Sequence, residues 1–278
     1  MQIKKNQNIY LTNNISNTNP KQISSTNFTG NLAQDMFEYG AIELGKHYTN
    51  KPINWQTIKK VVQQLKFGEN RYIVGVSGRS GCGKSTLCEN LTQTRSSSEL
   101  SHMTSDMYFS DNSSNMKKYG SFLEMLKAGF DFDNPYALNL AQQSNDLEGL
   151  KKGISVKIPK YSFDTCTSTP NSTLKEPSKV ILNDGIYSLL NSRNIKEKNP
   201  INDLGIFIDV SNNELLNRCL ARARYSKETL LYLFNKAQAG ANKYINPNHA
   251  DIILNGEIPP EDLTLAVEPL IKALLIKS

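Results

Sequence analysis

The sequence predicts an α/β fold in which a mostly parallel five-stranded sheet is flanked by helices. Two observations lead to this prediction. From residue 68 onward, short apolar runs that suit single buried strands alternate with segments whose apolar residues recur at helical spacing. A glycine-rich loop stands between the first apolar run and the first of these helical segments. The length of 278 residues, 38% of them hydrophobic, allows one large domain or two modest ones.

The predicted strands are five apolar runs. The first, residues 72–76, is uninterrupted and rich in β-branched residues, as expected for a strand that is covered on both faces. The other four are residues 100–104, 180–182, 206–210 and 251–254. Helical segments separate most of these runs, which favours parallel pairing because parallel neighbours need long crossover connections.

Helical spacing predicts helices at residues 84–93, 134–149, 213–223 and 227–239, with a closing helix at 261–276. The same spacing within residues 31–67 predicts a helical N-terminal extension. Residues 1–30 are rich in Asn, Ser, Thr and Gln, and we expect a flexible polar arm because they cannot bury enough surface to offset the entropy of ordering. Residues 68–278 then form the main domain.

Charge and cysteine usage narrow the class of protein. The 32 Lys and Arg residues exceed the 26 Asp and Glu residues by six, a mild and dispersed surplus that suits anionic ligands but does not indicate nucleic acid as the main ligand. Residues 263–276 contain charges and a proline, so no membrane span is expected, and the polar N-terminal residues predict no secretory signal. The four cysteines form no CxxC pair, which predicts neither a disulfide framework nor a zinc site and favours the cytoplasm.

The strongest motif is a complete G-x-x-x-x-G-K-[ST] loop that is followed by Thr86. Its glycines permit a tight turn whose N–H groups point at a polyphosphate, and the following helix adds the positive end of its dipole. Lys84 is expected to reach the β- and γ-phosphates, and Ser85 to bind Mg²⁺. Cys82 is interpreted as a small side chain that fits the loop, with oxidative control as the alternative. The predicted nucleotide-binding residues are Gly78, Arg79, Ser80, Gly81, Cys82, Gly83, Lys84, Ser85 and Thr86.

Two acidic residues follow predicted strands. Asp184 ends the run at 180–183, and Asp106 follows the run at 100–105. Because the carboxyl ends of parallel strands meet at one edge of a sheet, we expect Asp106 to face the same crevice as Lys84. With Ser85, the two acids are candidate metal ligands for phosphoryl transfer, which depends on positioning and charge neutralisation. The alternatives are that Asp184 opens a glycine turn and that Asp106 caps a helix.

Between about residues 70 and 255 the chain resembles the uridine kinase and phosphoribulokinase family of P-loop kinases, and most closely its uridine-cytidine kinases. The resemblance rests on motifs in the same order, at residues 75–86, 105–109, 130–137, 158–163, 183–186 and 246–253. It implies a three-layer P-loop kinase fold. It also implies ATP- and Mg²⁺-dependent phosphorylation of a small-molecule hydroxyl, most often the 5′-hydroxyl of a pyrimidine nucleoside.

The resemblance also implies roles for individual residues. Asp106 would be the general base or the acid that orients the acceptor hydroxyl, and Lys84, Arg218 and Arg222 would stabilise the transferring phosphoryl group. The metal shell would consist of Ser85, Asp106 and Asp184, and the substrate-binding residues would be Phe132, Asp133, Tyr161, Phe163, Cys166 and Arg218. Without the resemblance, the arginines fit a solvated helical face and the aromatic residues fit a core.

Two departures from the family pattern bear on the site, the first on the acceptor and the second on the metal. Cys166 stands where uridine kinases carry a histidine, and Asp184 stands where the family usually has a glutamate. A thiol is a poorer partner for a pyrimidine carbonyl than an imidazole is. Kinases for pantothenate, a sugar or a sugar phosphate, and a nucleotide-binding regulatory protein without turnover, therefore stay open as alternatives. A homo-oligomer is also left open, since residues 31–67 suit an edge cover, a dimer contact or a docking site.

Overall fold

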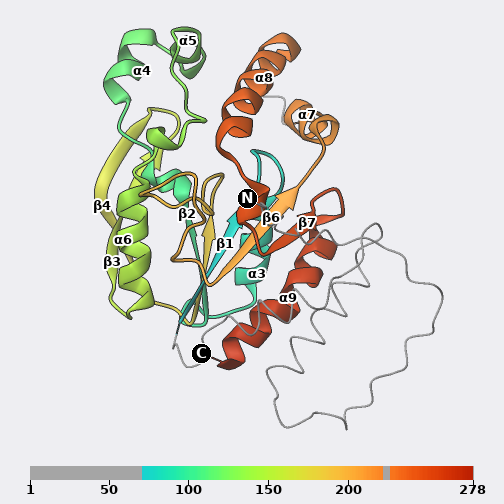
Figure 1. The fold of residues 1–278 in the computed structure, drawn as a ribbon. Helices are drawn as coiled ribbons and strands as arrows, with labels where there is room; N and C mark the ends of the chain where they lie inside the picture. The colour runs from blue at the N-terminus through green and yellow to red at the C-terminus, as the bar shows by residue number, and fades with distance from the viewer. Residues whose placement is uncertain (1–70, 222–225, 278) are drawn as a thin grey trace, which may run out of the picture.

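The computed structural model describes residues 71–221 and 226–277 (Figure 1). The predicted polar arm and helical extension lie outside the described residues, as does Arg222. The central sheet has the order β2-β5-β1-β6-β7, and each of its pairings is parallel. Its strands are β1 (Tyr72–Ser77), β2 (Leu100–Thr104), β5 (Val180–Asp184), β6 (Leu204–Asp209) and β7 (Ile252–Asn255). The predicted five-stranded parallel sheet is confirmed.

Helices cover both faces of this sheet and make a three-layer architecture (Figure 1). On one face, α3 (Lys84–Gln93) and α9 (Pro260–Lys277) pack against alternate residues of β1, including Val74 and Val76. On the other face, α6 (Leu140–Lys151) packs against Ile73. Successive strand residues point to opposite faces, so a strand covered twice must be apolar throughout. This explains the uninterrupted apolar sequence of β1.

The helix predicted at residues 134–149 is divided in the structure. A short 3₁₀ turn, η2 (Pro135–Ala137), precedes α6, which begins only at Leu140. The side chain of Asn139 accepts a hydrogen bond from the Gln142 N–H at 3.0 Å and caps the start of α6. The other predicted helices correspond to α3, α7 (Asn212–Ala221), α8 (Lys227–Tyr244) and α9. None of the helices in the described ranges is both long and apolar enough to cross a membrane.

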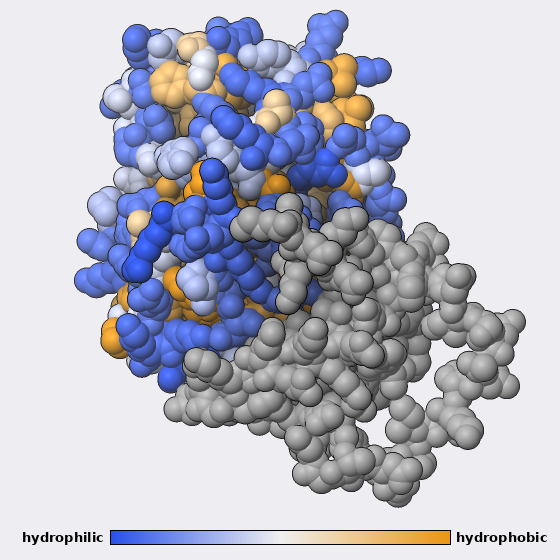
Figure 2. Space-filling view, in the orientation of Figure 1, coloured by the Kyte–Doolittle hydropathy of each residue, from blue (hydrophilic) through white to orange (hydrophobic). Residues whose placement is uncertain are grey.

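Several elements were not predicted from the sequence. An antiparallel hairpin of β3 (Val156–Ser162) and β4 (Thr167–Lys175) lies beyond α6. Most of β4 is exposed and polar on both faces, so it lacks the apolar alternation that reveals a strand. The remaining elements are η1 (Ser105–Tyr108), α4 (Ser113–Tyr119), α5 (Phe122–Lys127) and η3 (Pro247–His249). Figure 2 shows apolar patches at the end of the molecule that carries α4, α5 and α8.

Asp251 joins β7 to β6 through both its backbone and its side chain. Its N–H donates to the Gly205 carbonyl at 2.7 Å, and its Oδ2 accepts from the Gly205 N–H at 2.7 Å. Lys198 Nζ approaches the other carboxylate oxygen at 2.5 Å. Asp251, which directly precedes β7, therefore holds the starts of β6 and β7 together and has a structural role.

We predict that Asp251→Ala lowers the free energy of unfolding by about 1–3 kcal/mol, because it leaves the Gly205 N–H without its acceptor. Asp251→Asn keeps an oxygen at this position and should lose less. Lys198→Ala removes only a partly exposed ion pair, so it should cost less than about 1 kcal/mol. Urea unfolding of the three variants measures the difference. An equal loss in Lys198→Ala and Asp251→Ala would show that the ion pair, not the hydrogen bond to the Gly205 N–H, carries the stability.

Candidate active site

The loop between β1 and α3 depends on glycine and on one small buried side chain. A Cβ atom on Gly78 would lie 2.6 Å from both Cys82 Sγ and the Ile208 carbonyl oxygen, and the φ of Gly78 is +151°. Gly83, which precedes α3, has a φ of +103°, in the left-handed region that side chains disfavour. Cys82 is only 1% exposed. The structure therefore gives Cys82 the packing position of a small side chain inside the loop.

The side chain of Lys84, the first residue of α3, folds back over the phosphate loop. Its Nζ donates to the carbonyl oxygens of Gly78 at 3.0 Å and Arg79 at 3.2 Å, and the residue is 8% exposed. Because neutral carbonyl oxygens do not compensate its charge, the buried ammonium group can still bind an anion. The loop thus holds a positive charge beside backbone groups and the start of a helix.

The two predicted acids lie in the same cavity as the loop. This cavity has a volume of about 190 Å³, and its lining consists of Ser80, Gly81, Gly83, Lys84, Ser85, Thr86, Thr104, Asp106, Asp184, Gly185 and Ile186. The register of β2 against β5 pairs Thr104 with Asp184, so Asp106 follows just beyond the end of the pairing. The Ser85 hydroxyl donates to Asp184 Oδ2 at 2.7 Å. Lys84, Ser85 and both acids are therefore brought together from three elements.

The surroundings of the two carboxyl groups shift their pKa values in opposite directions. Burial alone would raise the pKa of Asp184, but hydrogen bonds from His102 and Ser85 and the charge of Lys84 hold it below its ordinary value. Burial raises the pKa of Asp106, the negative charge of Asp184 adds to this effect, and the charge of Lys84 opposes it. Asp184 is thus kept ionised, whereas Asp106 holds a proton more readily. Two neighbouring acids whose pKa values are shifted apart in this way are typical of a site in which one acid binds a metal and the other accepts a proton.

One buried oxygen at the site has no hydrogen-bond partner among the described residues, and a bound cation would be a suitable partner for it. Asp184 Oδ1 is buried and accepts no hydrogen bond from the described residues. An ionised oxygen without a donor is costly in the interior of a protein. The hydroxyl of Ser85 and the carboxyl of Asp106 face the same cavity, and oxygen ligands of this kind are those that Mg²⁺ prefers. The donor set fits a magnesium ion.

Two predicted arginines extend away from this cavity. Arg218 donates to the Gly256 carbonyl at 2.7 Å and to the Cys82 carbonyl at 3.3 Å, and its Nε pairs with Glu214 at 2.7 Å. Arg79 of the loop contacts Asn212 and the Val210 carbonyl, and donates to Gln238 of α8 at 3.0 Å. These guanidinium groups connect the loop to α7, α8 and the segment after β7. Arg222 lies outside the described residues.

Arg218 also borders a second cavity of about 370 Å³ on the flank of the loop. Its lining includes Thr86 of α3, Ile258 between β7 and α9, and Pro260 at the start of α9. Sequence reasoning did not identify these last two residues as part of the site. No motif marks them, because the cavity forms only where three segments far apart in the chain meet.

Of the predicted substrate-binding residues, the three aromatic ones lie together around Phe109, whereas Arg218 lies apart from them beside the phosphate loop. The ring centroid of Phe109 is 5.2 Å from that of Tyr161, 5.7 Å from that of Phe163 and 6.4 Å from that of Phe132. Phe163 is 53% exposed, whereas Cys166 in the β3–β4 turn is 1% exposed and directs its thiol at the Phe163 carbonyl at 3.8 Å. Phe109 was part of a recognised motif but was not assigned to the site. The cluster offers aromatic faces, and its thiol is turned inward.

Asp133 is a half-buried carboxyl that lies against α8. A Cβ atom on Gly240 of α8 would come within 2.9 Å of Asp133 Cβ, so the absence of a side chain there permits the close approach. The Tyr187 hydroxyl donates to the Asp133 carbonyl oxygen. Burial and the neighbouring Asp131 raise the pKa of Asp133 to about 6, and Lys236 opposes the shift. A carboxylate in this state would be stabilised by hydroxyl donors of a ligand.

A parallel sheet with a phosphate loop after β1 and acids at the ends of β2 and β5 defines a phosphotransferase of the P-loop class. The chain belongs to the Phosphoribulokinase / Uridine kinase family, whose model matches residues 73–261. The predictions of family, fold class and enzyme class are therefore confirmed.

Known relatives agree with this assignment. The uridine kinase of Staphylococcus haemolyticus is 26% identical over 192 residues, covering 66% of this chain and 87% of the relative. The phosphoribulokinase of Synechocystis is 28% identical over 188 residues, covering 66% of this chain and 52% of the relative. A solved structure from Silicibacter sp. TM1040, provisionally described as a fructose transport system kinase, aligns with a TM-score of 0.52 at 18% identity. That alignment covers 70% of this chain and 95% of the other.

We predict that Asp133→Asn stabilises the protein at neutral pH. The folded-state pKa of about 6 lies above the ordinary value of 3.8, so the folded chain binds the proton more tightly than the unfolded chain. The wild type therefore loses stability as pH rises from about 4 to about 6, and the neutral variant avoids this loss, gaining about 1–3 kcal/mol. Urea unfolding of the wild type and the variant at pH 4 and pH 7 measures this difference in stability. Asp164→Asn, on an exposed turn, is the control, and the same gain at both pH values would contradict the assignment.

Proposed function

We propose that this chain is an ATP- and Mg²⁺-dependent kinase for a small-molecule hydroxyl, and that its acceptor is the 5′-hydroxyl of a pyrimidine nucleoside. The observation that carries the proposal is the cavity of about 190 Å³ in which the phosphate loop, Asp106 and Asp184 meet. Membership of the phosphotransferase family supports the reaction type.

The chemistry follows from the residues around this cavity. Lys84 and the loop N–H groups would hold the β- and γ-phosphates, and Ser85 and Asp184 would hold Mg²⁺, which neutralises phosphate charge when bound. Asp106 would orient the acceptor hydroxyl and accept its proton as the oxygen bonds to the γ-phosphorus and the bond to ADP breaks. The raised pKa of Asp106 suits a group that takes up this proton.

The second cavity, of about 370 Å³, suits the base of the nucleotide donor. Its lining includes Gly81 of the loop, Thr86 of α3, Ile258 and Pro260. The aromatic faces of a planar base pack against apolar walls, while backbone carbonyls and the Arg218 guanidinium can bind its polar edge. The anchoring of Arg218 to Gly256 and Cys82 would keep this wall in place.

Aromatic faces and a carboxylate support a nucleoside as the acceptor. Phe163 is half exposed beside Phe109 and Tyr161, and exposed aromatic rings stack readily on nucleobases. Asp133 supplies a carboxylate that hydrogen bonds from ribose hydroxyls would stabilise. The arrangement thus provides one group for each part of a nucleoside.

One observation favours a different small alcohol, such as pantothenate, a sugar or a sugar phosphate. The Cys166 side chain is buried and its thiol is directed at the Phe163 carbonyl, so it offers no polar atom to a pyrimidine edge. Specificity for a base depends on such polar contacts. This alternative keeps the nucleotide half of the site unchanged and differs only in the acceptor.

An acceptor screen separates these two functions. We expect uridine or cytidine to stimulate ADP release from ATP and Mg²⁺ by the full-length protein, with a nucleoside 5′-monophosphate as the product identified by mass spectrometry. Stimulation by pantothenate or sugars alone would reject the nucleoside and support the alternative. No stimulation by any of these compounds would reject both.

Two substitutions test the assigned roles. Asp106→Asn should lower kcat by about 10²–10⁴-fold with little change in nucleotide affinity, because the general base acts on the acceptor and asparagine keeps an oxygen available to the metal. Lys84→Ala should weaken ATP binding as well, because Lys84 contacts the phosphates. Lys272→Ala on α9, where the lysine side chain is 56% exposed, is the control and should match the wild type. Full turnover in Lys84→Ala would contradict the site.

A further inference from the structure

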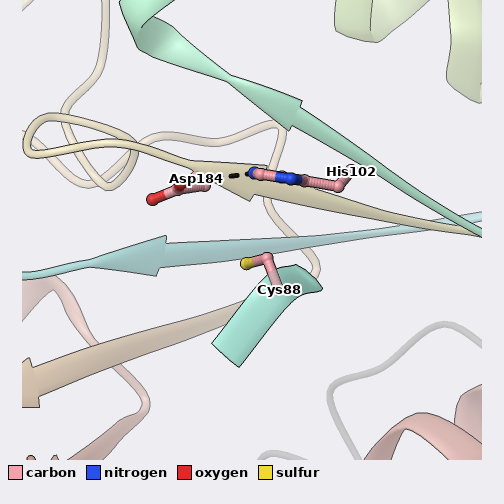
Figure 3. Close-up of side chains that lie close together, drawn as sticks. All are labelled: Cys88, His102 and Asp184. Carbon is pink, nitrogen blue, oxygen red and sulfur yellow. Dashed lines mark hydrogen bonds and ion pairs between the residues drawn. The ribbon is translucent and has the colours of Figure 1, made fainter. Parts of the chain in front are cut away.

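Three side chains that can bind transition metals lie close together: Cys88 of α3, His102 of β2 and Asp184 of β5 (Figure 3). One ligand atom from each lies within 4.8 Å of the others. We propose that these residues form a Zn²⁺-type metal site that inhibits the enzyme by taking Asp184 away from magnesium. The site is distinct in its chemistry from the oxygen-lined magnesium site but shares one carboxylate with it.

The spacing is close to that of ligands around one ion. His102 Nε2 lies 3.2 Å from Asp184 Oδ2, and zinc–ligand bonds of about 2.0–2.3 Å place neighbouring tetrahedral ligands roughly 3.3–3.6 Å apart. The sulfur of Cys88 lies within 4.8 Å of both, so it would have to move closer to them by up to about 1 Å to share one ion. The three ligands come from elements that the sheet and α3 hold in place.

The ligand types select against magnesium and in favour of zinc. Thiolate and imidazole are ligands of Zn²⁺ and related ions, whereas Mg²⁺ prefers oxygen. Three protein ligands leave a fourth position open for water or a phosphate oxygen.

Burial and charge also fit a divalent ion. Cys88 is fully buried and Asp184 is 1% exposed, while the His102 side chain is 20% exposed and lies on the side open to solvent. The Cys88 thiol loses its proton to solvent when an ion takes the proton's place, because the thiolate is the form that binds a metal. The thiolate and the Asp184 carboxylate then balance the two charges of the ion. Lys84 and Asp106 flank the cluster with opposite charges.

Inhibition follows from the shared carboxylate. Asp184 Oδ2 now accepts hydrogen bonds from both Ser85 and His102. An ion held by Cys88 and His102 would draw this carboxylate toward β2 and α3 and away from the magnesium shell that Ser85 helps to form. Metal binding itself is independent of the proposed function, whereas the inhibitory effect rests on it.

Cobalt tests the site directly, because Co²⁺ replaces Zn²⁺ and reports its ligands in the absorption spectrum. Titration of the metal-free full-length protein should give one tetrahedral Co²⁺ per chain with a thiolate-to-cobalt charge-transfer band that Zn²⁺ abolishes. Cys88→Ser and Cys88→Ala should lose the band, and His102→Gln should weaken binding by at least about tenfold. Cys219→Ser, at another free cysteine, should keep the band. Its absence from the wild type, or its persistence in both Cys88 variants, overturns the site.

The inhibitory effect is measured as the ratio of turnover with and without Zn²⁺ within each variant, so differences in basal activity cancel. Zn²⁺ should inhibit the wild type and Cys219→Ser, and Cys88→Ser should be resistant. Equal inhibition in Cys88→Ser would overturn the inhibitory role. If no acceptor is turned over, the proposed function fails while the cobalt spectra still decide the metal site.

Discussion

The parallel register of β1 against β5 is the constraint on which the site depends. It pairs Val76 with Asp184, so the acid stands beside the strand that leads into the phosphate loop. The hydrogen bond from Ser85 to Asp184 spans this junction at 2.7 Å. A slip of one residue would turn the side chains of β5 to the opposite face and remove Asp184 from the cavity. Both faces of these strands are buried, and that burial holds the register.

A buried amide extends this constraint to the second acid. Gln143 of α6 donates from Nε2 to Ser105 Oγ at 3.0 Å and to Asn183 Oδ1 at 2.9 Å. These acceptors directly precede Asp106 and Asp184 in the chain, so one side chain ties together the two strand ends that carry the acids. Leaving any of these buried polar groups unpaired is costly, which makes the arrangement rigid. Rigid placement of charged groups is the main requirement of phosphoryl transfer.

The sequence predicted the elements whose patterns are local. The strand at 72–76, the phosphate loop and the helix at 84–93 agree with β1 and α3 because each has its own periodicity or motif. The hairpin of β3 and β4 was missed because β4 is polar on both faces. The predicted helix at 134–149 began too early because Asn139, a capping residue, lay within an apolar pattern. The pattern of apolar residues along a sequence does not reveal a helix cap or a strand that is exposed to solvent on both faces.

By itself, the sequence determined the class of this protein: a parallel α/β phosphotransferase whose loop residues and two acids follow predicted strands. Only the tertiary structure decided which side chains meet. It directed Arg79 toward α8, assembled a cavity from Gly81, Ile258 and Pro260, and brought Cys88 and His102 to Asp184, although cysteine spacing had indicated no metal site. The reason is physical. A sequence motif consists of residues that are close together along the chain. These contacts instead join distant segments, which become neighbours only when the sheet and its helices pack.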